Sequence, residues 1–278
     1  MSNKSTQKIT NSIFILSGVI TLLILIIVVG FILIKGFNVI DIEFLFSSPE
    51  DSGRDGGIFP MIISSILLII IASTISIPIG VGSAIYISQY PSNKRLISLI
   101  RFISQVLSSI PSIVFGLFGL SFLIFYLKWD WSIFSGGVVL ALMSIPTIYQ
   151  TSELSLQNVP EIYKEGCYAM GVGKWDCIKL IILPIALPGI FTGIMLAIMR
   201  SISEAAAVMY VVGSSLDIPI SIFDTGRPLP LHLYVLATEG ISMSNAFGTA
   251  AVLVIMVLVI TILSNYSINY YQTKKLGV

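Results

Sequence analysis

Six long stretches without a charged side chain dominate this sequence and constrain its fold more than any other feature. They cover residues 9–34, 56–93, 102–127, 131–152, 180–199 and 240–273. An α-helix needs about 20 apolar residues to cross a bilayer, and only helices and closed barrels satisfy their backbone hydrogen bonds there. Because the apolar runs are continuous rather than alternating, the sequence predicts an all-α integral membrane protein with six transmembrane helices.

The composition agrees with that fold class. Only 10% of the 278 residues are charged, whereas soluble domains have about 25%. The net charge of +1 gives no reason to expect a nucleic-acid partner; membrane lipid is the expected surrounding. The expected helices cover 12–34, 58–88, 104–127, 133–153, 181–212 and 246–270. The second contains Pro78 between two apolar turns, so we expect it to be tilted and kinked.

Lysine and arginine predict the orientation, since they are enriched in cytoplasmic loops. One side of the predicted topology holds ten of them and the other side holds four. The ten-charge side includes both ends of the chain, so both termini are predicted to be cytoplasmic. The run from Ile9 to Ile34 is too long for a signal-peptide core and is expected to remain as the first span. No soluble segment larger than a loop interrupts the spans, so we expect one transmembrane domain over residues 1–278, with its core at about 56–270.

The parts of a catalytic or metal site are missing from the sequence. It has one histidine, His232, and two cysteines whose spacing does not match a zinc site. Gly171 to Lys174 read GVGK, but Tyr168 and Trp175 stand where a phosphate loop needs glycine and Ser or Thr. We therefore expect no enzymatic activity, no ATP bound by this chain, no metal and no cofactor.

The longest cytoplasmic loop, residues 156–181, has an unusual composition. It includes EGCYAMGVGKWDCIKL, with Pro160 positioned to start a helix near Glu161. Gly171 and Gly173 permit a sharp bend, after which Lys174 to Leu180 can form a second short helix. Two interpretations remain open from the residues alone, a docking segment for a partner protein or an ordinary solvated loop helix.

A second feature is a pair of opposite charges in the fifth apolar segment. Arg200 and Glu204 stand four residues apart in MRSISEAAAVMY, and a continued helix would place them on one face. An ionisable residue at membrane depth is costly unless it is paired or faces a wet cavity. The pair could either fix helix packing or mark a substrate path, and the planar fork of Arg200 suits a phosphate-like oxyanion.

The loop resembles the cytoplasmic EAA motif of ABC-transporter permeases. Glu165, Gly171, Ile181, Leu183 and Pro184 match the spacing of that motif, while Gly166 and Cys167 replace its two alanines. The resemblance implies a type I ABC importer permease fold with a cytoplasmic coupling helix that sits in a groove of a separate ATPase subunit. Glu165, Ala169, Gly171 and Pro184 would then couple the chain to that ATPase.

Further segments narrow the resemblance to permeases of the phosphate-specific (Pst) system. These are IPIGVGSAIYISQY, IPSIVFGLFGL, RSISEAA and LPLHLY, the last of which is typical of the PstA-type subunit. This similarity covers most of residues 56–250 and implies a multi-pass protein of a prokaryotic cell membrane. It implies a PstC-like sister permease, two PstB-like ATP-binding subunits and an extracytoplasmic PstS-like phosphate-binding protein as partners. Arg200 and Glu204 would lie on the path of the substrate.

Alternatives are a PstC-type permease or a permease for sulfate, molybdate or phosphonate. A secondary transporter would need ion-coupling carboxylates near the middle of the membrane, and only Glu204 is expected at that depth. An intramembrane enzyme would need catalytic groups that the sequence lacks.

Overall fold

The computed structural model describes residues 3–90 and 93–271 of the chain. Within them, five helices are long and apolar enough to cross a membrane, and a bent pair of shorter helices raises the number to six. The prediction of an all-α membrane protein is therefore confirmed. A two-stranded hairpin, β1 (Pro49–Glu50) with β2 (Asp55–Gly56), is the sole sheet in these residues.

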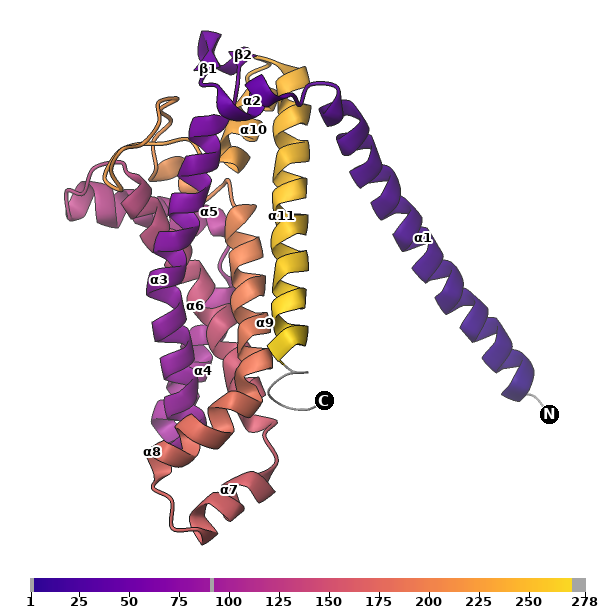
Figure 1. Cartoon of the computed structure of the whole chain (residues 1–278), viewed down its shortest axis with the longest axis vertical. Helices are drawn as coiled ribbons and strands as arrows, with labels where there is room; N and C mark the ends of the chain where they lie inside the picture. The colour runs from indigo at the N-terminus through magenta and orange to yellow at the C-terminus, as the bar shows by residue number, and fades with distance from the viewer. Residues whose placement is uncertain (1–2, 91–92, 272–278) are drawn as a thin grey trace.

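The helices follow the expected order along the chain. Those that form the spans are α1 (Asn3–Phe37), α3 (Phe59–Gln89), α4 (Lys94–Ser109), α5 (Ser112–Gly119), α6 (Ile133–Gln157), α9 (Leu183–Ile202) and α11 (Met243–Tyr271). Shorter helices connect them: α2 (Ile42–Phe46), α7 (Glu161–Ala169), α8 (Lys174–Cys177) and α10 (Leu229–Thr238). One end of the molecule carries α7 and α8, and the opposite end carries α2, the hairpin and α10 (Figure 1). We call them the α7 end and the α10 end.

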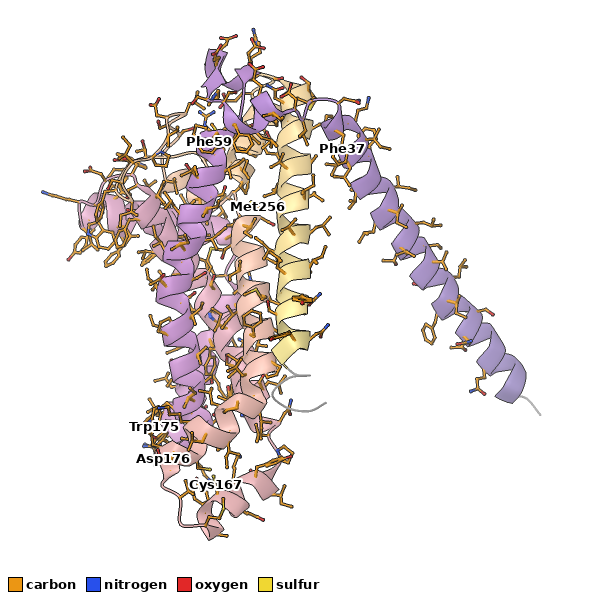
Figure 2. All side chains as sticks on the ribbon, viewed as in Figure 1. Phe37, Phe59, Cys167, Trp175, Asp176 and Met256 are labelled. Atoms are coloured by element: carbon orange, nitrogen blue, oxygen red, sulfur yellow. The ribbon has the colours of Figure 1, made fainter. Side chains whose placement is uncertain are left out.

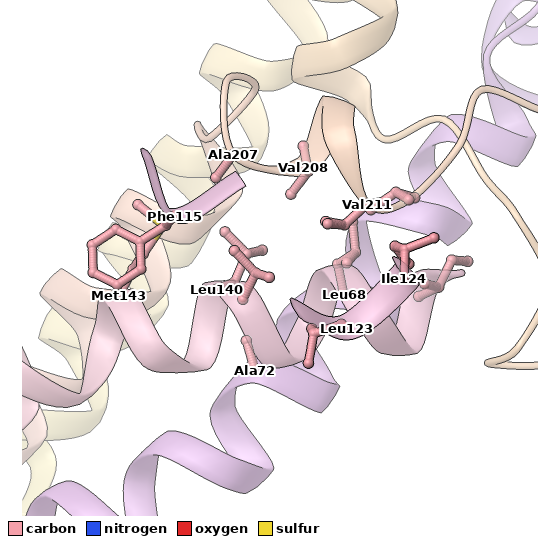
Figure 3. Packing of buried hydrophobic residues seen from close by; sticks show 13 residues of the cluster. Leu68, Ala72, Phe115, Leu123, Ile124, Leu140, Met143, Ala207, Val208 and Val211 are labelled. Atoms are coloured by element: carbon pink, nitrogen blue, oxygen red, sulfur yellow. The ribbon is translucent and has the colours of Figure 1, made fainter. Parts of the chain in front are cut away.

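Helix α6 is the centre of the bundle, with α3 on one side and α9 on another. Glycines allow the close approach of α3 and α6: a Cβ on Gly80 would lie 2.8 Å from Ile148, and a Cβ on Gly137 would lie 2.5 Å from Ile71. Toward the α10 end, Leu140 of α6 belongs to an apolar cluster with Ala207, Val208 and Val211 (Figure 3). Because lipid tails are as apolar as these side chains, close van der Waals packing rather than removal from water holds this cluster together.

The third expected span, 104–127, differs from the prediction. It begins ten residues earlier, at Lys94, and is broken near Pro111, where α4 and the helical stretch Ser112–Tyr126 meet at 98°. Proline lacks an N–H and disfavours helix in the residue before it, so the α-helix stops at Ser109 and restarts at Ser112. The glycines of α5 permit close helix contacts, since a Cβ on Gly116 would lie 2.7 Å from the carbonyl oxygen of Ala207.

The fifth expected span, 181–212, is also wrong at its end. Helix α9 stops at Ile202, and residues 203–228 form turns with one short 3-10 segment, Val208–Tyr210. Residue type alone gives little warning, because Ala205, Ala206 and Ala207 are strong helix formers. Their segment instead packs under α5, where Ala207 and Val208 are fully buried.

Helix α1 stands apart from the bundle. It leaves α11 near Phe37 and diverges toward the α7 end (Figure 1). Gly36 allows a close approach to α11, since a Cβ at this position would meet Phe247 and Ala251. Most apolar side chains of α1 are exposed, and none of the 18 residues of its most apolar window is buried. Lipid or another membrane protein must cover this helix.

Candidate functional site

The loop with the EAA-like spacing forms two short helices at the α7 end. Helix α7 starts directly after Pro160 and ends at Ala169, and the N–H of the next residue, Met170, donates to the carbonyl of Gly166 at 3.2 Å. Gly171 follows with φ of +72°, a conformation that an L-residue adopts only at a cost of roughly 1 kcal/mol or more. The chain then turns into α8, so Gly171 sets the angle between the two helices.

Buried contacts hold α7 firmly against the bundle. Cys167 of α7 and Cys177 of α8 are both free thiols and fully buried, and they belong to one apolar cluster with Ile178 and Ile182. The ammonium of Lys174 lies 4.5 Å from the ring centre of Tyr90, at the end of α3. Movement of α7 would therefore be transmitted through α8 into α9 and α3.

The outward face of α7 and α8 carries large apolar side chains. Ile162 is 72% exposed, Met170 69% and Trp175 59%. Cys167, Trp175 and Asp176 mark this end in Figure 2. Glu165 and Ala169 are exposed too, and a Cβ on Gly166 would meet no atom within 4 Å. Because this end projects beyond the spans, the exposed apolar group is typical of a protein-docking surface.

Pro184, the fourth coupling candidate, lies at the start of α9, just after a π-helical turn over Ile178–Ile182. The helical run continues without a break from Lys174 to Ile202, so Pro184 lies inside it and the π-helical turn stands where the proline cannot donate a backbone hydrogen bond. Pro184 is half-buried, so its place in the structure is the joint between α8 and the spanning helix α9 rather than the docking surface itself.

Arg200 and Glu204 are not brought together on one helix face. Arg200 is exposed in the last turn of α9, and Glu204 lies beyond the helix end. Among the described residues the ion pairs are Arg54–Asp51, Arg101–Glu153 and Lys164–Glu161, and none joins Arg200 to Glu204. An oxygen of Glu204 instead accepts a hydrogen bond from the backbone N–H of Ala207 at 3.3 Å. The expected one-face arrangement is wrong because α9 ends two residues before Glu204.

The structure contains an ion pair that the sequence interpretation missed. The guanidinium of Arg101 donates from Nε and Nη2 to Oε1 of Glu153, at 2.9 and 2.6 Å. The amide of Gln157 donates to the same oxygen at 3.0 Å. Arg101 comes from α4 and Glu153 from α6, and the Glu153 side chain is only 10% exposed. Arg101 was expected in a cytoplasmic loop, because the third span was predicted to begin after it.

The single histidine lies at the α10 end and has no catalytic neighbours. His232 is fully buried in α10, and burial together with the nearby charge of Arg227 lowers its pKa to about 4. In the two described ranges, 3–90 and 93–271, no three His, Cys, Asp or Glu side chains gather as metal ligands would.

Comparison with known proteins places these features in context. Residues 76–276 match the family described as binding-protein-dependent transport system inner membrane component. The chain is 31% identical over 282 residues to the probable ABC transporter permease protein YqgI of Bacillus subtilis, covering 96% of each protein. It is 35% identical over 205 residues to the phosphate transport system permease protein PstA of Mycobacterium leprae, covering 73% of this chain and 67% of that protein.

A solved structure shares the fold. The backbone superposes on a chain of a bacterial ABC transporter involved in the import of the acidic polysaccharide alginate, with a TM-score of 0.66 at 13% identity. The match covers 96% of this chain and 99% of the other. At that identity the likeness concerns the arrangement of the helices alone.

Proposed function

Because the chain belongs to the family of binding-protein-dependent transport system inner membrane components, we propose that it is the permease subunit of an ATP-driven importer of inorganic phosphate. The family makes it a membrane-spanning subunit of an ABC importer. Phosphate as the substrate is our proposal, supported by the relatives that carry the name of phosphate permeases.

The single observation that supports an anionic substrate best is Arg200. Its guanidinium is exposed near the end of α9 and is not paired with Glu204. With five N–H donors in a plane, arginine matches the oxygens of phosphate in a bidentate way. A charge at this depth requires a wet or polar surrounding, which a translocation path would supply. We propose that Arg200 contacts the substrate there and that Glu204 moderates its positive potential.

Substrate uptake tests the proposal directly. Vesicles that hold the complete complex are loaded with ATP on the ATPase side and given the binding protein with radiolabelled phosphate on the other side. We expect ATP-dependent uptake that excess unlabelled phosphate suppresses at least tenfold more strongly than equal sulfate or molybdate. Equal suppression by sulfate or molybdate would assign the chain to another oxyanion, and absence of uptake with all three would reject the substrate class.

The partners that we propose are a PstC-like sister permease, two PstB-like ATP-binding subunits and a PstS-like binding protein. Two surfaces support this assembly. The docking surface of α7 and α8 exposes Ile162, Met170 and Trp175 outside the spans, and the described residues bury no part of the most apolar window of helix α1. An ATPase would cover the first surface and the sister permease would share the second with lipid.

A pair of glycine variants tests the coupling role of the loop. Gly171→Leu places a side chain where φ is +72°, so it should change the angle of α7. We expect normal insertion into the membrane, loss of uptake and weaker co-purification of the ATPase. Gly166→Ala is the matched control, because its Cβ meets no atom of this chain within 4 Å. Wild-type uptake by Gly171→Leu would contradict a coupling role.

The proposed topology places the α7 end in the cytoplasm and the α10 end outside, with one transmembrane domain over the whole chain. Ser52 is exposed at the α10 end, in the turn between β1 and β2. A cysteine placed there should react with an impermeant thiol reagent added to intact cells. Reaction in inverted vesicles alone would contradict the topology.

A further inference from the structure

Between α4 and α6 the bundle has an open polar cleft. Its volume is about 410 Å³, and it is lined by Arg101, Gln105, Tyr149, Gln150, Glu153, Leu154 and Gln157. A second hollow of about 490 Å³ lies on the other side of Arg101 and Gln105. Hence both side chains stand between two hollows that are roomy enough for water and a small ion.

The cleft continues a polar stripe along α4. The stripe consists of Lys94, Ser98, Arg101, Gln105 and Ser108. Their spacing of four, three, four and three residues places them on one narrow face of the helix. At 1.5 Å per residue, the stripe extends roughly 20 Å from the helix start. The opposite face exposes apolar side chains such as Leu99, Ile103 and Val106. A polar stripe of this length on a helix packed against α6 needs water or a polar ligand beside it.

The hydrogen bonds leave part of the cleft open for a ligand. Arg101 uses Nε and Nη2 on one oxygen of Glu153, while Gln150 donates to Ser104 at 3.1 Å. The side chain of Tyr149 lines the cleft, and its hydroxyl is buried near Arg101 and Glu153 without a well-formed hydrogen bond to any described residue. A buried hydroxyl without a partner costs about 1–3 kcal/mol, and an oxyanion in the cleft would relieve that cost by accepting a hydrogen bond from it.

We propose that this cleft is a second substrate station on the α7 side of the membrane, in which Arg101, Gln105 and Tyr149 bind an oxyanion before its release. This inference rests on the proposed function. Glu153 holds the guanidinium of Arg101 in place and offsets most of its charge. The station therefore attracts the anion weakly, and weak binding is what release into the cytoplasm requires. Arg101 contacts the substrate, and Glu153 is a positioning residue.

Charge-matched variants of the complete complex separate this role from simple helix packing. Arg101→Gln leaves Glu153 buried without its counter-charge, so a defect is expected whether Arg101 binds the substrate or only packs the helices. The double variant Arg101→Gln/Glu153→Gln removes both charges and permits an amide pair. If the ion pair merely packs helices, uptake in the double variant returns to within twofold of wild type. If Arg101 contacts the substrate, assembly and binding-protein-stimulated ATP hydrolysis return while phosphate uptake stays at least tenfold below wild type.

A chemical probe checks the cleft without measuring transport. A cysteine at Leu154, which lines the cleft but is not a proposed contact of the anion, is labelled with an anionic and with a cationic methanethiosulfonate reagent, in inverted vesicles that hold the complex. We expect the cysteine to react faster with the anionic reagent than with the cationic one, and millimolar phosphate to slow that reaction. Adding Arg101→Gln and Glu153→Gln should abolish the preference for the anionic reagent. Arg95→Gln, which removes an arginine of α4 outside the cleft, is the control and should leave the preference intact.

The outcomes distinguish this inference from the proposed function. If wild-type vesicles take up phosphate but the double variant does so normally, or if phosphate does not slow the labelling, the cleft is not a substrate station and the importer proposal stands. If wild-type vesicles fail to take up phosphate, the substrate assignment itself is wrong.

Discussion

The molecule has two arginine–glutamate pairs of opposite character. Arg200 and Glu204 are four residues apart in the chain but are not joined, because α9 ends between them. Arg101 and Glu153 are 52 residues apart and are joined at 2.6 Å across two helices. The pair that is close in sequence thus has one exposed charge available for a ligand, whereas the distant pair joins a half-exposed arginine to a largely buried glutamate.

The difference teaches what each pair can do. Glu153 restrains Arg101 and offsets its charge, so Arg101 can bind an anion only weakly. Arg200 is exposed and forms no ion pair with a described residue, and Glu204 accepts a hydrogen bond from the backbone of Ala207 instead. A dianion moving from the α10 end to the α7 end would meet Arg200 first and Arg101, whose charge Glu153 offsets, later. Such an order favours capture at one side and release at the other.

The largest expected effect concerns the stability of the joined pair. Glu153→Ala leaves the half-exposed guanidinium of Arg101 without its partner. Breaking a fully buried pair costs about 3–5 kcal/mol, and because water screens the exposed side of Arg101 we expect about 2 kcal/mol here. We expect the Tm of the detergent-solubilised complex to fall by about 5 °C or more. Glu204→Ala is the matched control and should lower Tm by less than half as much. Equal decreases in Tm for the two variants would contradict the claim that only the Arg101–Glu153 pair stabilises the fold.

A slightly smaller effect is expected from disturbing the segment that carries Glu204. A Cβ on Gly116 would lie 2.7 Å from the carbonyl oxygen of Ala207, so Gly116→Val must displace residues 203–208. Overpacking of this kind costs about 1–3 kcal/mol. We expect reduced phosphate uptake with an unchanged labelling preference of a cysteine at Leu154. A simultaneous loss of that preference would show that the two sites are not independent.

Acid sensitivity is expected from the α10 end rather than from either pair. His232 has a pKa lowered to about 4 in the folded chain, against about 6.5 when unfolded. The unfolded state therefore binds the proton first, so stability is full above pH 6.5 and falls as the pH drops from 6.5 toward 4. At pH 6 the loss is about 0.8 kcal/mol. His232→Gln should remove this part of the difference in Tm between pH 8 and pH 6; an unchanged difference would contradict the assignment.

The smallest effect is expected for Glu204→Gln. The amide oxygen of glutamine can still accept the N–H of Ala207, so the turn after α9 should keep its shape. Removal of the negative charge near Arg200 should change phosphate uptake less than threefold. A loss of tenfold or more, measured as initial uptake rate, would mean that Glu204 itself gates the passage of the anion.

Sequence patterns predicted a span well where the ends of the uncharged apolar run coincide with the ends of the helix. The second span was expected at 58–88 and lies at Phe59–Gln89. The bend after α7 followed from Gly171, whose positive φ is observed. The end of α9 was missed because alanines 205–207 favour helix, and tertiary packing under α5 overrides that preference.

The contact between Arg101 and Glu153 could not be predicted from the sequence, because contacts between helices that are distant in the chain leave no local sequence pattern. Two signals did exist. Glu153 ends an otherwise uncharged run within a helix, and the polar residues of α4 recur every three or four positions. The stripe of polar residues predicts that Arg101 belongs to a helix rather than to a loop, as α4 shows.

The phosphate moved per ATP hydrolysed, compared between wild type and Arg200→Gln, tests the central claim most directly. Both quantities are measured together in vesicles that contain the complex and the binding protein, with Arg200→Lys as the charge-conserving control. The account predicts that Arg200→Gln assembles and hydrolyses ATP but moves at least tenfold less phosphate per ATP, and that Arg200→Lys restores part of it. An unchanged ratio in Arg200→Gln would contradict the claim that the substrate of this permease passes Arg200.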